Sequence, residues 1–210
     1  MFVVTVNDRP LQTPEGAPLA VPNRALADVL SAEWREHGDR PLTRLANTAI
    51  DRMPVLRLQA LEAVLVFAAT DLVCHWADAP LLLVERQRAT WQPLLDLVAQ
   101  RHQAHLMVTA GVMPIAQPRA AFSALRDALK AMDSFHLTVL HEATVLSGSL
   151  VIALSLIEGA IDAEAAFRAA QLDALFQAER WGLEAETAAR HDSLQAELRL
   201  CARFVTLLGA

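Results

Sequence analysis

The only clear strand signals in this sequence lie within residues 2–21. The run Phe2-Val3-Val4-Thr5-Val6 is rich in β-branched residues and is followed by a turn at Asn7-Asp8-Arg9-Pro10. Two further short apolar runs are separated by Pro14-Glu15-Gly16-Ala17-Pro18. These alternations predict one small antiparallel β unit and leave the rest of the chain for helices.

From residue 25 onward, apolar residues recur three and four positions apart, which is typical of helices packed on a core. The composition agrees, because Ala and Leu dominate and Tyr is absent. We therefore predict an α+β fold, predominantly α, with residues 1–53 forming a small β-containing domain and residues 54–210 a helical bundle. A strand near Leu106 would let segment 104–116 return to the small sheet. The expected helices span residues 25–37, 54–76, 84–102, 118–131, 134–158, 162–181 and 184–208.

Charge and apolar runs limit the classes of partner. The net charge of -6 and the pI near 5.6 do not suit a phosphate-binding surface, so we expect no nucleic-acid partner. The uncharged stretch from Ala143 to Ile157 is short and polar for a membrane span, so we expect no stable membrane insertion. Cys74 and Cys201 are expected to be buried in a reducing compartment, because nothing like a signal peptide precedes them.

Catalytic and metal-binding motifs are missing from the sequence. It contains no GxSxG, GxxxxGK, GxGxxG or HExxH pattern, which argues mildly against catalysis. We interpret Ser147-Gly148-Ser149 as a small-residue segment that lets helices pack closely, and we assign no catalytic residue, metal site or cofactor. A small-molecule-binding or enzymatic domain, with a cleft between the β unit and the bundle, remains the alternative.

A sorted polar stripe marks the segment before Met53. On a helical wheel, Arg44, Asn47, Thr48 and Asp51 share one face, opposite a face of Leu and Ala. Arg44 and Asp51 could simply tie the small sheet to the helices. The stripe could also contact a partner.

The expected helix 162–181 has two apolar faces about half a turn apart, the second of which ends at Trp181. One face should pack on the core. The other face either packs against helix 184–208 or forms an exposed surface for a partner. Glu179 ends the first face, where it either pairs with an Arg or projects toward a ligand.

The segment Pro41-Leu42-Thr43-Arg44-Leu45-Ala46-Asn47-Thr48-Ala49-Ile50-Asp51 closely resembles the signature of the Atp-twelve (ATP12) family, the assembly chaperones of the ATP synthase catalytic head. The resemblance extends in order over nearly the whole chain, through Asp8-Arg9-Pro10, Glu33-Trp34, Trp91-Gln92-Pro93, Gly111-Val112-Met113-Pro114, Leu146-Ser147-Gly148-Ser149 and Glu179-Arg180-Trp181-Gly182. One departure is a shorter connection between Glu36 and Pro41 than family members usually have, which we interpret as a surface deletion.

The resemblance implies a small β-containing N-terminal domain followed by an orthogonal helical bundle. It implies a chaperone and not an enzyme. The client is the unassembled alpha subunit of ATP synthase, which the chaperone holds until the beta subunit takes the chaperone's place. This exchange requires no nucleotide. Glu179 and Trp181 match the family's Glu-x-Trp-Gly motif and are the first partner-binding candidates, with Arg44, Asn47 and Asp51 as a second patch. We expect a monomer when free, in the bacterial cytoplasm, or in the mitochondrial matrix if this is a processed eukaryotic form.

Overall fold

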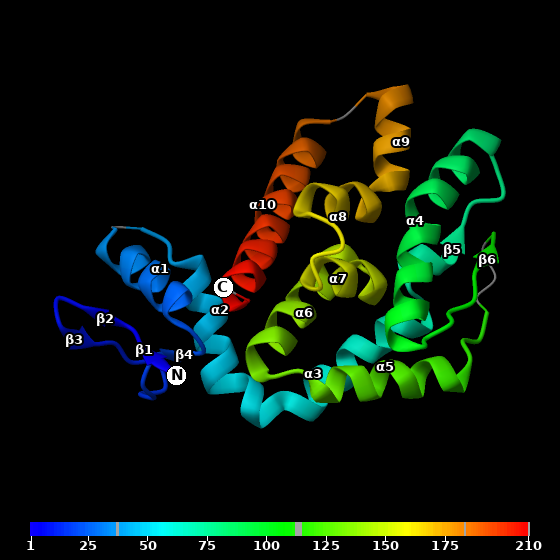
Figure 1. Cartoon of the computed structure of the whole chain (residues 1–210). Coiled ribbons are helices and arrows are strands. Elements are labelled where there is room, and N and C mark those ends of the chain that lie inside the picture. Colours follow the sequence, from blue (N-terminus) through cyan, green and yellow to red (C-terminus); the bar gives the residue numbers. More distant parts are fainter. Residues whose placement is uncertain (37, 112–114, 183, 210) are drawn as a thin grey trace.

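The computed structural model describes residues 1–36, 38–111, 115–182 and 184–209. Helices build most of the fold (Figure 1), and a small antiparallel β unit precedes them, which confirms the predicted class. The α-helices are α1 (Arg24–Arg35), α2 (Pro41–Asn47), α3 (Met53–Ala69), α4 (Leu81–His102), α5 (Arg119–Ala131), α6 (Ser134–Ser147), α7 (Leu150–Ile157), α8 (Ala163–Ala170), α9 (Leu172–Trp181) and α10 (Ala185–Leu208).

The N-terminal β unit consists of two short antiparallel pairs. Its strands are β1 (Phe2–Val3), β2 (Thr5–Val6), β3 (Arg9–Pro10) and β4 (Ala20–Val21). Strand β1 pairs with β4, and β2 pairs with β3. The turn between β2 and β3 is Asn7-Asp8, and both residues have the positive φ that a tight two-residue hairpin turn requires. Val4, Leu19 and Val21 are buried and anchor this unit on α1.

Residues near 109 form a strand, but it does not join the N-terminal unit. Strand β6 (Thr109–Ala110) pairs in parallel with β5 (His75–Trp76), which follows a 3-10 turn at Leu72–Cys74. The expected return of segment 104–116 to the small sheet is therefore wrong for its described residues, because its strand partner lies directly after α3. Residues 112–114 of that segment lie outside the described residues.

Two of the expected helices are each divided into two. The helix predicted over 134–158 ends at Gly148, whose φ is +70°, and Ser149 caps the start of α7 by accepting a hydrogen bond from the Ile152 N–H. The helix predicted over 162–181 breaks at Gln171. The reason lies in packing, since α8 contacts α7 and α10, whereas α9 turns to contact α4.

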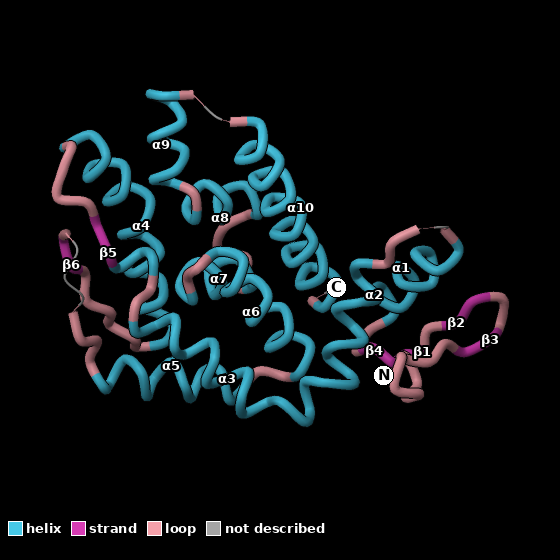
Figure 2. Tube along the Cα trace, turned by 180° about the vertical axis from the view of Figure 1, so that it is seen from behind, coloured by secondary structure: helices cyan, strands magenta, loops and turns pink. Residues whose placement is uncertain are grey.

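The core is centred on α7. All of its residues from Leu150 to Ile157 are buried, and α3, α4, α6, α8 and α10 pack around it. Figures 1 and 2 both show α7 enclosed by these helices, seen from opposite sides. A helix that is apolar all round belongs in such a position.

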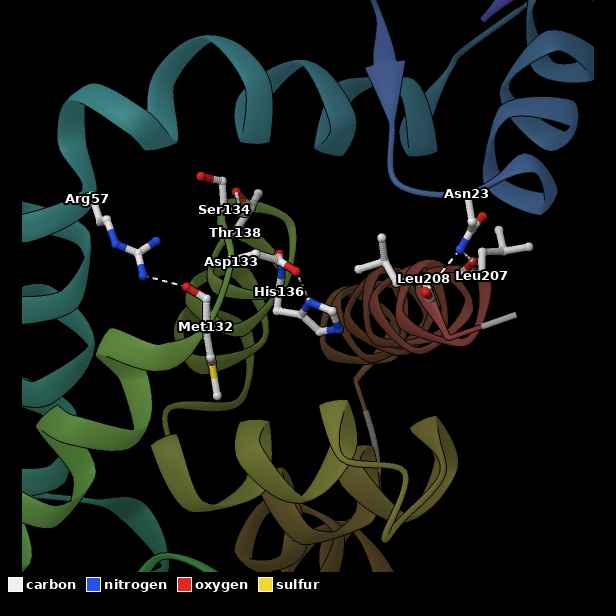
Figure 3. A network of polar contacts seen from close by, with 9 residues as sticks. All are labelled: Asn23, Arg57, Met132, Asp133, Ser134, His136, Thr138, Leu207 and Leu208. Atoms are coloured by element: carbon white, nitrogen blue, oxygen red, sulfur yellow. Dashed lines mark hydrogen bonds and ion pairs between the residues drawn. The ribbon is translucent and has the colours of Figure 1, made fainter. Parts of the chain in front are cut away.

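Side-chain contacts to main-chain carbonyls join parts of the chain that are distant in sequence (Figure 3). The Asn23 side chain accepts a hydrogen bond from the Leu26 N–H at the start of α1. Its amide Nδ2 donates to the carbonyls of Leu207 and Leu208, at 2.7 and 3.0 Å, at the end of α10. This clasp fixes the N-terminal unit against the last helix of the bundle.

Within the part of the chain that the structure describes, one helical stretch, Pro41–Cys74, is long and apolar enough to cross a membrane by length and composition alone, with a mean hydropathy of 1.4 over its most apolar 18-residue window. Helices α5 and α6 cover one side of α3. On its other side Val55, Leu58 and Val66 are exposed. The stretch is therefore a bundle helix with one apolar outer face.

Candidate functional site

The predicted polar stripe lies at an irregular turn between α2 and α3. Residues Thr48–Arg52 form a π-helical turn, in which the Met53 N–H bonds to the Thr48 carbonyl five residues earlier. Pro54 follows directly, and a widened turn relieves the clash that a proline ring makes with the carbonyl four residues before it. The sequence predicted a shared face but not this turn.

The three predicted residues of the second patch line one open cleft with a volume of 580 Å³. Helix α1 supplies Trp34, and the shortened connection before α2 supplies Asp39 and Arg40. The full lining is Pro14, Glu15, Trp34, Gly38, Asp39, Arg40, Thr43, Arg44, Asn47, Thr48, Asp51 and Arg52.

Two of the three predicted residues tie neighbouring elements together. The Asp51 carboxylate accepts hydrogen bonds from the Thr13 hydroxyl at 2.6 Å and from the Glu15 N–H at 3.3 Å, which joins the β unit to the π-helical turn. Arg44 pairs with Glu197 of α10 at 3.2 Å. The buried Oδ1 of Asn47, in contrast, has no hydrogen-bond partner among the described residues.

The first predicted pair lies at the edge formed by α4 and α9. The Glu179 carboxylate accepts two hydrogen bonds from Arg86 of α4, at 2.7 and 2.8 Å, and both side chains are partly exposed. Trp181, at the end of α9, has 77% of its surface exposed. Glu179 thus pairs with an arginine, which is one of its two interpretations from sequence. Trp181 does not pack on the core.

An apolar pocket of 450 Å³ lies between α4, α8 and α9. Leu172, Leu175 and Phe176 line it, and Arg86 and Glu179 lie at its border. Arg86 and Arg180 both lie over the Phe176 ring, with their guanidinium carbons 5.2 and 4.1 Å from its centre. The interpretation of residues 162–181 as one helix is wrong, because the chain breaks at Gln171. The first predicted face nevertheless continues across the break, since Ala165 of α8 lines the pocket together with Leu172 and Phe176 of α9. Phe167, on the second predicted face, packs on His191 of α10.

The two candidate patches are separate. Helices α2 and α9 lie well apart in both Figures 1 and 2, so a partner that contacts both patches must span much of the molecule.

A buried carboxylate that sequence reasoning missed holds the centre of the bundle. Asp71 accepts hydrogen bonds from the Ser149 hydroxyl at 2.5 Å, the Val151 N–H at 3.1 Å and the Val73 N–H at 3.2 Å. Burial raises the pKa of Asp71 from 3.8 to about 6 against the lowering effect of these bonds. The Ser147-Gly148-Ser149 segment is therefore a helix junction that binds Asp71, and not a packing segment inside one helix as predicted.

The two cysteines are free and buried, as expected. Burial raises the pKa of each thiol to about 12, so both stay protonated and unreactive at neutral pH. Among the described residues, no group of three or more His, Cys, Asp or Glu side chains could hold a metal ion.

The fold is a helical bundle behind a small β unit, and the comparisons assign this fold to the class of non-enzymatic assembly chaperones. Residues 1–99 match the family model described as ATP12 chaperone protein. A crystal structure of ATP12 from Paracoccus denitrificans is 37% identical with a TM-score of 0.93, over 98% of this chain and 91% of that one. The chain belongs to the ATP12 chaperone family, the F1-ATPase assembly chaperones.

Two further relatives agree. A crystal structure of a protein from Agrobacterium tumefaciens, described as a candidate chaperone, is 35% identical with a TM-score of 0.88, over 97% of this chain and 78% of that one. The mitochondrial protein atp12 of Schizosaccharomyces pombe is 23% identical in an alignment 199 residues long, which covers 86% of this chain and 68% of that protein. The family thus includes bacterial and mitochondrial members.

Proposed function

We propose that this chain binds the unassembled alpha subunit of ATP synthase, shields its subunit interface, and releases it when the beta subunit replaces the chaperone. An unassembled subunit exposes apolar surface that would otherwise aggregate. A chaperone for it needs its own exposed apolar anchor and must bind without consuming a cofactor. Membership of the ATP12 family supports this assignment.

The observation that carries the proposal is the α4–α9 edge. Trp181 is 77% exposed at the end of α9, and the same helix lines an apolar pocket of 450 Å³ through Leu172, Leu175 and Phe176. Large aromatic side chains next to apolar pockets are the usual energetic centres of protein interfaces. Leu81 and Leu82 at the start of α4 are also exposed and extend the apolar character of this helix pair.

The Arg86–Glu179 pair gives this edge its polar component. Because both side chains are partly exposed, the pair contributes little to the stability of the fold. It holds the Glu179 carboxylate in one place beside the pocket, where a cationic or N–H group of the client can share it. Polar groups fixed at the border of an apolar pocket set the orientation of a partner.

The cleft lined by Arg44, Asn47 and Asp51 provides the second contact. Its separation from the α4–α9 edge suits a client as large as an ATP synthase subunit. We place the protein in the bacterial cytoplasm, or in the mitochondrial matrix if the source is eukaryotic, and propose that it is a monomer before it binds its client.

Copurification with separately expressed alpha and beta subunits tests the proposal. Wild-type protein should capture free alpha and not beta, and added beta should release the captured alpha. Trp181→Ala and Glu179→Lys should each reduce the capture, because the first removes the anchor and the second places a third cation beside Arg86 and Arg180.

A charge swap separates recognition from structure. The double variant Arg86→Glu with Glu179→Arg restores the ion pair with its polarity reversed. If the client contacts the Glu179 carboxylate, the double variant still fails to capture alpha. If the ion pair has only a structural role, the double variant captures alpha like the wild type. Leu58→Ala on the exposed face of α3 is the matched surface control and should capture alpha like the wild type. Equal capture of alpha by all variants would refute the proposed site.

A further inference from the structure

The described part of the chain contains three buried side-chain polar atoms without a hydrogen-bond partner, and all three belong to residues that line the same cleft. They are Nε1 of Trp34, Nε of Arg40 and Oδ1 of Asn47. Native proteins satisfy nearly all buried polar atoms, since an unsatisfied one costs free energy. Their concentration in one open cleft of 580 Å³ points to a ligand that supplies the missing partners.

The walls of the cleft are held in place by their own contacts. Glu33 joins α1 to the start of α2, because its carboxylate accepts hydrogen bonds from the Leu42 N–H, the Thr43 N–H and the Thr43 hydroxyl. Arg40 lies over the Trp34 ring, with its guanidinium carbon 4.1 Å from the ring centre. These contacts fix the positions of the unpaired atoms before any ligand arrives, which reduces the entropic cost of binding.

The chemistry of the three atoms defines the ligand. The indole Nε1–H and the guanidinium Nε–H can only donate, whereas the amide Oδ1 can only accept. A complementary group must therefore offer an acceptor and a donor together, as a peptide amide does. An anion offers acceptors alone, so it would leave the Asn47 oxygen unpaired. The three carboxylates of the cleft, Glu15, Asp39 and Asp51, also offset its three arginines, Arg40, Arg44 and Arg52, so its lining has no net positive charge.

We infer that this cleft binds an extended peptide segment of the client through its main chain. A carbonyl of the segment accepts from Trp34 and Arg40, and an N–H of the segment donates to Asn47. The identity of this segment rests on the proposed function, in which the client is the alpha subunit. Main-chain recognition fits a chaperone site, since it holds a segment with little dependence on its side chains.

The indole N–H signals of the four tryptophans provide a direct readout. The Trp76 and Trp91 indoles already donate to the carbonyls of Val73 and Ala169, at 2.8 and 2.9 Å, and Trp181 is exposed. In ¹H–¹⁵N spectra of the full chain, overlapping synthetic peptides that tile the alpha subunit are added singly. At least one peptide should move the Trp34 indole proton downfield while the Trp76 and Trp91 signals stay in place.

Two variants complete the test. Trp34→Phe removes the N–H but keeps an aromatic ring under Arg40, and Asn47→Leu removes the acceptor but keeps a side chain with the same branching. Each should weaken binding of that peptide at least tenfold, whereas Leu58→Ala, the surface control on α3, should leave the peptide affinity unchanged. Circular dichroism and thermal melting of each variant establish that it is folded.

The outcomes distinguish this inference from the proposed function. If the alpha subunit copurifies with the chain but no peptide moves the Trp34 signal and both variants capture alpha normally, the peptide site is refuted and the chaperone proposal stands. If inorganic phosphate moves the Trp34 signal and no peptide does, the cleft is an anion site and the inference is wrong. Peptide binding that both variants weaken supports it.

Discussion

Replacing Asp71 by Asn should change how the stability of this protein depends on pH. Asp71 is completely buried and accepts three hydrogen bonds from Ser149, Val151 and Val73. Burial raises its pKa in the folded state from 3.8 to about 6. Asn is similar in size but does not titrate, so the variant removes this proton equilibrium.

The magnitude follows from the two pKa values. Between pH 3.8 and about 6, the folded state keeps the proton on Asp71 while the unfolded state has lost it. The folded state therefore binds more protons, and the free energy of unfolding falls as pH rises through this window. The shift of 3.8 to about 6 corresponds to about 3 kcal/mol. The stability advantage of wild type over Asp71→Asn should shrink by about this amount from pH 4 to pH 7.

Chemical denaturation of both proteins across this pH range measures the difference directly, because the titrations of all other groups cancel. Ser149→Ala serves as a second variant. The Ser149 hydroxyl lowers the pKa of Asp71, so its removal should extend the loss of stability to higher pH. A difference between wild type and Asp71→Asn that stays constant would show that folding does not shift the pKa of Asp71, and one that grows with pH would show that the carboxylate is stabilised in its charged form. Either result would refute the reasoning.

Three further changes have expected outcomes. Asn23→Ala removes the cap of α1 and the bonds to the end of α10, and it should lower the free energy of unfolding by about 1–3 kcal/mol in urea titrations. Gly148→Ala should cost about 1 kcal/mol in the same assay, because φ is +70° there while the added methyl meets no atom within 4 Å. Trp181→Ala should weaken alpha-subunit binding roughly 30-fold in calorimetry, about 2 kcal/mol, without lowering Tm, since the side chain is exposed.

The fold class could be predicted from sequence because local patterns were consistent with it. The clear strand signals lie before residue 22 and helical spacing dominates after them, so the N-terminal β unit and most helices are where the sequence places them. The short strand His75–Trp76 was missed, because the helix predicted over 54–76 ends at Ala69. The breaks at Gly148 and Gln171 were harder to predict. Apolar residues recur at helical spacing before and after each break, so periodicity continues across a junction that is decided by which helix each half packs against.

The candidate site could be predicted in part. The polar stripe of Arg44, Asn47 and Asp51 does line one cleft, because residues three and four apart share a face even where a π-helical turn interrupts the helix. Its partners Trp34 and Arg40 could not be found this way, since tertiary packing brings α1 beside α2. The same holds for Asp71, whose hydrogen-bond partners Ser149 and Val151 lie about eighty residues away in sequence.

The most direct test of the account is a competition experiment with purified components. The chain is bound to unassembled alpha subunit on a support, and beta subunit is then added without nucleotide. The account predicts that wild type retains alpha alone, that beta displaces the chaperone from alpha, and that Trp181→Ala fails to retain alpha. Retention of beta alone, of neither subunit, or of a stable complex that beta cannot displace would contradict it.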